Sequence, residues 1–351
     1  MRPSSTCSDP GRQTGPAAGI NALRAANAAA LSEPGRITLA VRRPNVWLLG
    51  LACLGFLLVA SQAHPLAQLA LGTWVPLPVI LVGWRSGERS ALGLAVAAAL
   101  LVSATQPTLK GMWENLSIGE LLLVGVLLSS FRNRGISPAP AIIMTAGTLA
   151  LVALFFLLIQ AAWAGQSPLA LFHQKARETA QTLEKVFAQT GMETRSWLPL
   201  GGSPWDWETL VSRIFPGLFV INVALVAWLN TAAALFLARV LNWPEAGLPL
   251  SDWSNPEWLI FLFLGAGFLL LAPLASLRLI GLNLLLVTGF LYFCQGVAVV
   301  AATFQRFQAP LFLRLLGYPL LFVNPVFFLV IILGLADLWL DFRRLHRPHK
   351  T

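Results

Sequence analysis

From Val46 onward the chain alternates long apolar runs with short polar breaks, and this pattern restricts the fold more than any other feature. A membrane-spanning helix needs about 17–25 mainly apolar residues. The strands of a membrane β-barrel would instead show alternating runs of about ten residues. The sequence therefore predicts an all-α fold, a polytopic bundle with eight or nine membrane segments. The nine candidate segments are 46–63, 66–84, 90–106, 117–131, 139–163, 213–241, 257–277, 280–305 and 317–340.

The composition agrees with a membrane location. Hydrophobic residues make up 56% of the 351-residue chain, and charged residues only 11%. A soluble domain usually carries about a quarter of its residues as Asp, Glu, Lys and Arg. With so few charges the chain could not cover a water-exposed globule. The composition therefore excludes a soluble enzyme, a disordered scaffold and a disulfide-rich secreted domain.

The net charge of +9 is concentrated at the two ends of the chain. Residues 1–45 and 341–351 together carry +7 of it. We expect 1–45 to be a disordered basic tail, 46–340 to be the transmembrane domain, and 341–351 to be a basic cytoplasmic tail. This distribution does not indicate a nucleic-acid-binding groove. It agrees with a topology signal at an anionic membrane surface.

Basic residues beside the apolar segments predict the orientation in the membrane. Arg36 and its neighbours precede the first segment and place the N-terminus in the cytoplasm. Nine spans would then place Arg343 outside, against the rule. Either one segment does not span, or the chain folds back near Pro319, Asn324 and Pro325. We therefore expect eight spans in a bacterial inner membrane, with both termini cytoplasmic.

Residues 164–212 form the one long polar insertion, predicted to lie outside. Ser167 and Pro168 are typical of a helix start, and the helix is expected to run to Gln189. Its pattern predicts an amphipathic helix that lies on the bilayer surface or over the bundle. It is either a simple interfacial cap or a lid over a ligand cavity. The predicted apolar stripe consists of Leu169, Phe172, Ala176, Ala180, Leu183 and Phe187.

Polar groups and prolines inside the apolar segments are the candidate site residues, because such groups are costly in lipid. Asn222 and Asn230 are eight residues apart and are expected to share one helix face. Pro76 and Pro78 break a helix and leave carbonyl groups that need partners in a protein-lined cavity. We expect these four residues and Glu120 to line a cavity between segments 66–84, 117–131 and 213–241. The alternatives are a plain proline kink, amides that join helices, and a carboxylate at the interface.

A second group of polar residues is expected to serve packing or coupling. Asn283 and Gln295 lie in an apolar segment whose glycines recur at near-heptad spacing, which lets helices approach closely. Asp337 and Asp341 are four residues apart and are expected to lie on one face of the last helix.

Motifs for chemistry are missing from the sequence. There is no GxxxxGK[ST], HExxH or GxSxG motif, and the three cysteines include no CxxC pair. The four histidines are scattered. We therefore expect no enzyme activity, no cofactor and no metal site.

Three short motifs carry a family resemblance: Pro76-Leu-Pro78 before Gly83-Trp-Arg-Ser-Gly87, Gln295-Gly296, and the final Gly334…Asp337…Asp341-Phe-Arg343. Over residues 45–345 they resemble the YybS-like family of predicted membrane proteins, a domain of unknown function. That family is in turn similar, in its first half, to the S components of energy-coupling-factor transporters. Those components are six-helix bundles that capture a vitamin or metal and depend on separate ATPase and coupling subunits. The Ala-x-x-x-Ala motif of their first helix is not present in residues 46–63.

Two functions follow as expectations. The first is a transporter-like, small-molecule-binding membrane protein, with a cavity and with other membrane subunits as partners. The second is a scaffold or biogenesis factor that binds other membrane proteins or lipids, with a closed interior. The presence of a cavity around Glu120 and Asn222 would distinguish them.

Overall fold

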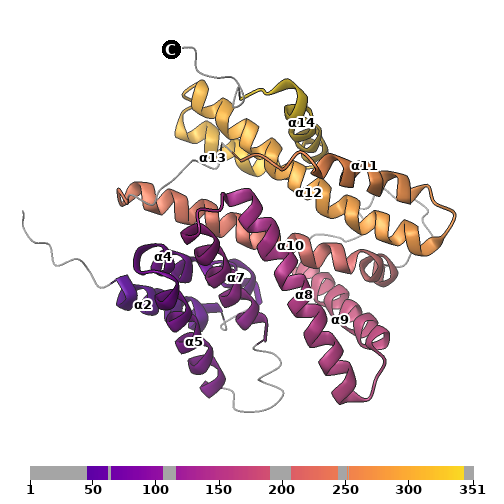
Figure 1. Cartoon of the computed structure of the whole chain (residues 1–351), viewed down its shortest axis with the longest axis horizontal. Helices are drawn as coiled ribbons and strands as arrows, with labels where there is room; N and C mark the ends of the chain where they lie inside the picture. Colours follow the sequence, from indigo (N-terminus) through magenta and orange to yellow (C-terminus); the bar gives the residue numbers. More distant parts are fainter. Residues whose placement is uncertain are drawn as a thin grey trace, which may run out of the picture. The chain divides into compact units, whose positions relative to one another are not determined.

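The computed structural model describes residues 46–61, 65–105, 116–189, 207–243, 251 and 253–343, and the regular elements among them are all helices (Figure 1). These residues belong to one unit of the chain, Asn45–Thr351. The predicted N-terminal tail and residues 344–351 of the predicted C-terminal tail lie outside the described residues.

The first part of the chain packs around one short central helix. Helix α4 contacts the helices α2, α5 and α7, and its Val79 and Ile80 are fully buried. The proline at its start ends the preceding helix, so the predicted segment 66–84 is divided in two. The helices of this part are α2 (Val46–Ser61), α3 (Pro65–Gly72), α4 (Pro76–Ser86), α5 (Glu88–Thr105) and α7 (Leu116–Asn133).

The middle part holds two long helices and the predicted amphipathic helix: α8 (Pro138–Ala164), α9 (Pro168–Gln189) and α10 (Trp207–Val240). The Ser167 hydroxyl accepts a hydrogen bond from the Ala170 N–H (3.2 Å) and so caps α9 as predicted. Ala176 and Ala180 are buried where α9 packs on α8 and α10. Leu169, in contrast, is 65% exposed. The buried stripe therefore begins at Leu171, two residues after the predicted start.

The last part is arranged around α12, which packs against α11, α14 and α10 (Figure 1). A Cβ atom on Gly296 would collide with Val330 of α14, and one on Gly334 with the Tyr292 carbonyl of α12. The two backbones approach this closely because both positions lack a side chain. The helices of this part are α11 (Leu259–Leu270), α12 (Ala275–Arg306), α13 (Leu311–Leu320) and α14 (Val326–Leu340).

Three of the described helices are long and apolar enough to cross a membrane: Pro138–Ala164, Thr209–Val240 and Ala275–Arg306. Shorter apolar helices are Val46–Ser61, Leu259–Leu270, Leu311–Leu320 and Val326–Leu340. The predicted ninth segment, 317–340, is not one helix, because the chain between α13 and α14 is non-helical. It breaks near Pro319, Asn324 and Pro325, where the sequence predicted a fold-back.

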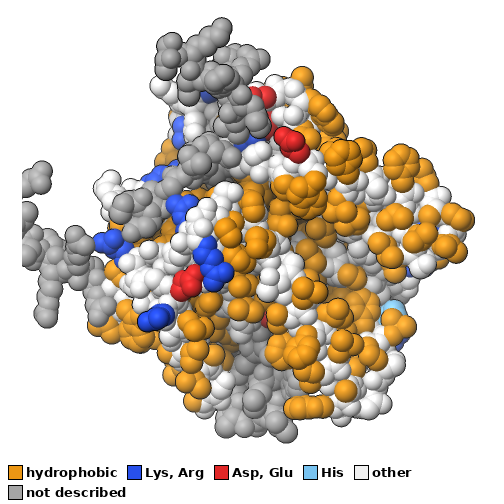
Figure 2. Space-filling view, in the orientation of Figure 1, with side chains coloured by type: hydrophobic (Ala, Val, Ile, Leu, Met, Phe, Trp, Pro, Cys, Tyr) orange, Lys and Arg blue, Asp and Glu red, His pale blue; other side chains and the backbone are white. Residues whose placement is uncertain are grey.

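Arginine side chains collect where several helices end. Arg132 at the end of α7 lies over the Trp84 ring of α4, and Arg85 of α4 lies over Trp243, just after α10. Helices α10 and α12 meet near their starts, where Asn283 binds Gly217. Further along, Val223 and Ala227 lie in one core cluster with Phe290 and Val297, so both helices run toward this end. We call it the basic end: the final turns of α4, α7, α10, α12 and α14. Figure 2 shows Lys and Arg grouped along one flank while hydrophobic side chains cover most of the remaining visible face. The arginines of the basic end are Arg85, Arg132, Arg239, Arg306 and Arg343.

Candidate functional site

The proline break between α3 and α4 is closed by an amide from another helix. Pro76 has no N–H, and the Leu77 N–H donates to Trp74 (3.0 Å), so the Thr73 carbonyl has no helical donor. The Asn230 Nδ2 of α10 donates to this carbonyl at 2.7 Å and also to the Val226 carbonyl at 2.8 Å. Asn230 is fully buried. The predicted site residue Asn230 therefore completes the backbone hydrogen bonding of the predicted break.

Helix α7 packs tightly on the same break. A Cβ atom on Gly125 would lie 2.7 Å from the Val79 Cβ and 2.9 Å from the Pro76 carbonyl oxygen. Real Cβ atoms do not come so close, so only a glycine fits here without movement of α4. Pro76 and Pro78 are both buried. The carbonyls and prolines at this break face protein atoms.

The remaining predicted cavity residues are not brought together. Asn222 is exposed while Asn230 is buried, so the expectation that they share one face of α10 is wrong. At 3.6 residues per turn, eight residues leave the two side chains about 80° apart around the helix. Glu120 is partly exposed near the start of α7.

A second amide closes a second proline kink. Pro216 lies inside α10, and in a regular helix the next N–H, of Gly217, would donate to the Arg213 carbonyl. Instead the Gly217 N–H donates to Asn283 Oδ1 (2.7 Å), while Asn283 Nδ2 donates to the Arg213 carbonyl (2.8 Å). One side chain of α12 thus takes the place of the missing helical bond. Asn283 therefore joins α12 to α10 at the Pro216 kink.

The predicted residues Gln295 and Asp337 meet in a buried polar cluster between the middle of α12 and the last turn of α14. Asp337 Oδ2 accepts hydrogen bonds from Arg343 Nη2 (2.6 Å), Arg343 Nε (3.2 Å) and Gln295 Nε2 (3.1 Å). Its Oδ1 accepts the backbone N–H of Phe342 at 3.1 Å. The Asp337 and Arg343 side chains are only 3% and 4% exposed. A buried ion pair is compatible with stability only when it is hydrogen-bonded in this way.

The same cluster fixes the chain that enters α11. Arg343 Nη1 donates to the carbonyls of Ser251 (2.7 Å) and Trp253 (2.6 Å). Asn255 donates its backbone N–H to Gln295 Oε1 (3.3 Å) and its side-chain amide to the Leu291 carbonyl (2.8 Å). The cluster therefore ties the end of α14, the middle of α12, Ser251 and residues 253–255 together.

The expected pairing of Asp337 with Asp341 on one helix face is wrong. Helix α14 ends at Leu340, and Asp341 adopts a left-handed backbone with φ +40°. The chain then turns, so Arg343 folds back onto Asp337. The sequence reasoning missed Arg343 and Asn255. The spacing of six residues between Asp337 and Arg343 was the available signal for this ion pair. Its use required knowing that α14 ends at Leu340, between the two residues.

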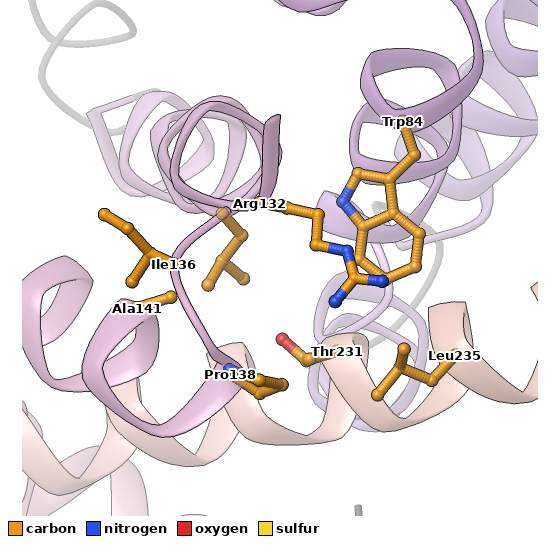
Figure 3. A pocket seen from close by; sticks show the side chains of 8 residues that line it. Trp84, Arg132, Ile136, Pro138, Ala141, Thr231 and Leu235 are labelled. Atoms are coloured by element: carbon orange, nitrogen blue, oxygen red, sulfur yellow. The ribbon is translucent and has the colours of Figure 1, made fainter. Parts of the chain in front are cut away.

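A small cavity lies beside α4. A cavity of about 10 Å³ lies where α4, α7, α8 and α10 meet, and it is enough for about one water molecule. Figure 3 shows the Arg132 guanidinium beside the Trp84 ring, with Pro138 and Thr231 across the space. The Trp84 indole N–H is buried and has no hydrogen-bond partner among the described residues.

A larger cavity of about 310 Å³ lies at the basic end, between the end of α12 and the end of α14. Two phenylalanines and two arginines form its walls, so it combines apolar and cationic surface. Arg343 is held by Asp337, whereas Arg306 is exposed. In the described part of the chain, no three His, Cys, Asp or Glu side chains come together as metal ligands. The cavity is lined by Ala302, Thr303, Arg306, Phe307, Phe342 and Arg343.

Comparison with known proteins finds one family. The family described as "Predicted membrane protein (DUF2232)" matches residues 52–338, which is most of the chain. No curated protein and no solved structure matches the sequence.

Proposed function

The chain belongs to the DUF2232 family of predicted membrane proteins, and we propose that it binds an anionic amphiphile, a lipid with a phosphate headgroup, at its basic end. In this proposal it is a binding or scaffold protein of the membrane, and neither an enzyme nor a conduit. The observation that carries the proposal is the cavity of about 310 Å³ between the ends of α12 and α14.

The lining of this cavity suits a phosphate with an attached acyl chain. Basic pockets between membrane helices are typical binding sites for anionic headgroups. Arg306 supplies the cation that faces the ligand, since the Arg343 charge is already compensated by Asp337 at 2.6 Å. Thr303 supplies a hydroxyl, and Phe307 and Phe342 supply apolar contacts for the glycerol and the first methylenes.

The closed helix breaks favour this role over transport. Transporters use discontinuous helices whose free carbonyls and N–H groups bind the substrate near the bilayer midplane. Here Asn230 and Asn283 occupy such groups at the breaks near Pro76 and Pro216. A cavity of about 10 Å³ is the space found beside α4, far below the 300–1,000 Å³ typical of ligand pockets.

The positive-inside rule then gives the orientation in this proposal. Arg85, Arg132, Arg239, Arg306 and Arg343 all lie at the basic end, so we place that end on the cytoplasmic side of a bacterial inner membrane. The N-terminal residues, which carry further arginines, and the C-terminal residues would be cytoplasmic too.

Lipid-dependent thermal stability of the purified protein tests the proposal. A lipid that binds only the folded state at 100 times its Kd stabilises it by about 2.7 kcal/mol. We expect phosphatidylglycerol to raise the Tm of the detergent-solubilised protein more than phosphatidylcholine does, and Arg306→Gln to remove the difference. Arg278→Gln, at the opposite end of α12, is the matched control and should keep it. Equal stabilisation by both lipids, or equal behaviour of the two variants, would refute the proposal.

A second candidate is the vitamin- or metal-capturing role implied by the resemblance to transporter S components. One observation favours it: the buried Trp84 N–H beside Arg132 and Thr231 has no acceptor among the described residues, so it would donate to a carbonyl or carboxylate oxygen of a small ligand if α4 and α7 moved apart, because the present space of about 10 Å³ admits only a water molecule. A thermal-shift panel of vitamins and metals tests this role. Stabilisation that Trp84→Phe abolishes and Arg306→Gln leaves intact would support this second site instead of the first.

A further inference from the structure

We propose that α13 and α14 form a re-entrant hairpin that enters and leaves the membrane at the basic end, and that its tip at Asn324 contacts a second copy of this chain. The proposal is independent of the lipid site. It concerns the stretch that the sequence left ambiguous between a span and a fold-back.

The chain turns back immediately after α12. Gln308 has a left-handed backbone (φ +47°), and the Ala309 N–H donates to the Phe304 carbonyl at 2.9 Å, which ends the helix. Arg314 Nη2 donates to the same carbonyl at 3.4 Å. A Cβ atom on Gly317 would lie 2.7 Å from the Phe304 ring, so α13 starts its course against the last turns of α12.

The hairpin reaches the middle of α12. The Phe322 ring lies 5.1 Å from the Phe293 ring, and the Phe327 ring lies 4.7 Å from it. Phe293 precedes Arg306 by 13 residues, which corresponds to about 20 Å along the helix axis. The hydrocarbon core is about 30 Å thick. The tip of the hairpin therefore lies near the level of the bilayer centre.

Helix α14 then returns to the end from which α13 started. Gly334 contacts Tyr292 and Gly296, and after α14 ends Arg343 lies with Arg306 around one cavity. At 1.5 Å per residue, the 10 residues of α13 and the 15 of α14 span about 15 and 22 Å, each too short to cross. The stretch from Arg306 to Arg343 makes no net crossing, which also satisfies the positive-inside rule.

The tip exposes polar groups at a depth where lipid cannot satisfy them. Phe322, Val323, Asn324 and Pro325 are exposed and non-helical. At the breaks near Pro76 and Pro216 a neighbouring amide binds the free backbone groups, but within the described residues nothing hydrogen-bonds the Asn324 side chain. Irregular backbone at membrane depth is tolerated only against protein or a water-filled cavity.

A second copy is the occupant that best fits this tip. The Asn324 amide carries both a donor and an acceptor, so two such amides pair with each other across a two-fold axis. Its exposed neighbours are apolar and uncharged, namely Phe322, Val323, Phe328 and Leu329. Amides of this kind join membrane helices. The tip carries no charged residue, so a partner of opposite charge would gain nothing by binding there.

Cysteine accessibility tests the re-entrant path. In the full chain lacking Cys7 and Cys53, single cysteines at Gln308, Leu340 and Gln166 are labelled in intact and opened membrane vesicles with an impermeant maleimide. We expect the cysteines at 308 and 340 to react from one side of the membrane, and the cysteine at 166, beyond the far end of α8, from the other. Labelling of 308 and 340 from opposite sides would overturn the re-entrant hairpin.

Disulfide cross-linking in native membranes tests the partner. Asn324→Cys should give a dimer of the chain on oxidation, whereas Leu315→Cys, 68% exposed on the outer side of α13, should not. Asn324→Leu should weaken dimerisation about tenfold in detergent, the loss expected for one interhelical amide contact. Cross-linking of the cysteine at 324 to a different protein, its labelling by water-soluble reagents from either side, or a dimer unaffected by Asn324→Leu would each overturn the second-copy contact. None of these results would change the outcome of the labelling test.

Discussion

Removal of the Asp337 carboxylate is expected to destabilise the protein severely. Asp337 accepts four hydrogen bonds, two from Arg343 at 2.6 and 3.2 Å, one from Gln295 at 3.1 Å and one from the Phe342 N–H at 3.1 Å. In Asp337→Ala the Arg343 guanidinium keeps its two backbone carbonyl acceptors but loses its counter-charge. Because the Arg343 side chain is only 4% exposed, water cannot replace that counter-charge. Breaking a buried pair in this way costs about 3–5 kcal/mol.

Denaturant unfolding in detergent micelles, followed by tryptophan fluorescence, measures this loss. Asp341→Asn is the matched control, because it also removes one carboxylate charge four residues away, keeps the side chain's shape and polarity, and has a left-handed backbone with φ +40° that asparagine tolerates. We expect the control to stay within about 0.5 kcal/mol of wild type. The double variant Asp337→Leu/Arg343→Met should recover most of the stability, since no charge is left buried.

A small effect would refute this reasoning. If Asp337→Ala costs less than about 1 kcal/mol, the Arg343 side chain leaves its buried position at little cost. The cluster would then not be what holds Ser251 and residues 253–255 against α12. Equal losses for Asp337→Ala and the Asp341→Asn control would lead to the same conclusion.

Two further variants test the packing of α12. Gly296→Leu should destabilise the protein by about 1–3 kcal/mol, because a side chain there collides with Val330. The control Gly289→Ala has no atoms nearby and should be neutral or stabilising by about 1 kcal/mol. Unfolding in denaturant measures both variants, and similar losses of stability would contradict the close contact between α12 and α14. Asn283→Leu should lower the free energy of unfolding by about 1–3 kcal/mol in the wild-type background. The loss should be smaller in a Pro216→Ala background, because α10 can then straighten and form its own helical hydrogen bonds. A double-mutant cycle with no coupling energy would refute the role of this amide.

The sequence allowed the helices to be predicted much better than their contacts. Apolar runs predicted membrane helices, and the prolines at 76 and 78 correctly marked a helix break. Periodicity could not show what would fill that break, because Asn230 reaches Thr73 across 157 residues of chain. The amide was identified as notable, but its partner depends on how α10 packs against α4.

The buried polar cluster of Gln295, Asp337 and Arg343 shows the second limit of sequence reasoning. Gln295 and Asp337 were singled out because polar groups in apolar segments are costly, and the structure brings them together. The expected partner Asp341 is wrong because spacing arguments assume a continuing helix. The left-handed turn at Asp341 changes the direction of the chain and brings Arg343 to the acid in its place.

The hydrogen bonds of Asn283 to α10 also make the stability of α10 in the bilayer depend on α12. Until α12 arrives, α10 lacks the amide that binds its Gly217 N–H and its Arg213 carbonyl, and lipid offers no substitute for that amide. The side chain that satisfies them lies 66 residues further along the chain. Helix α10 is therefore more stable in the membrane as a pair with α12 than alone.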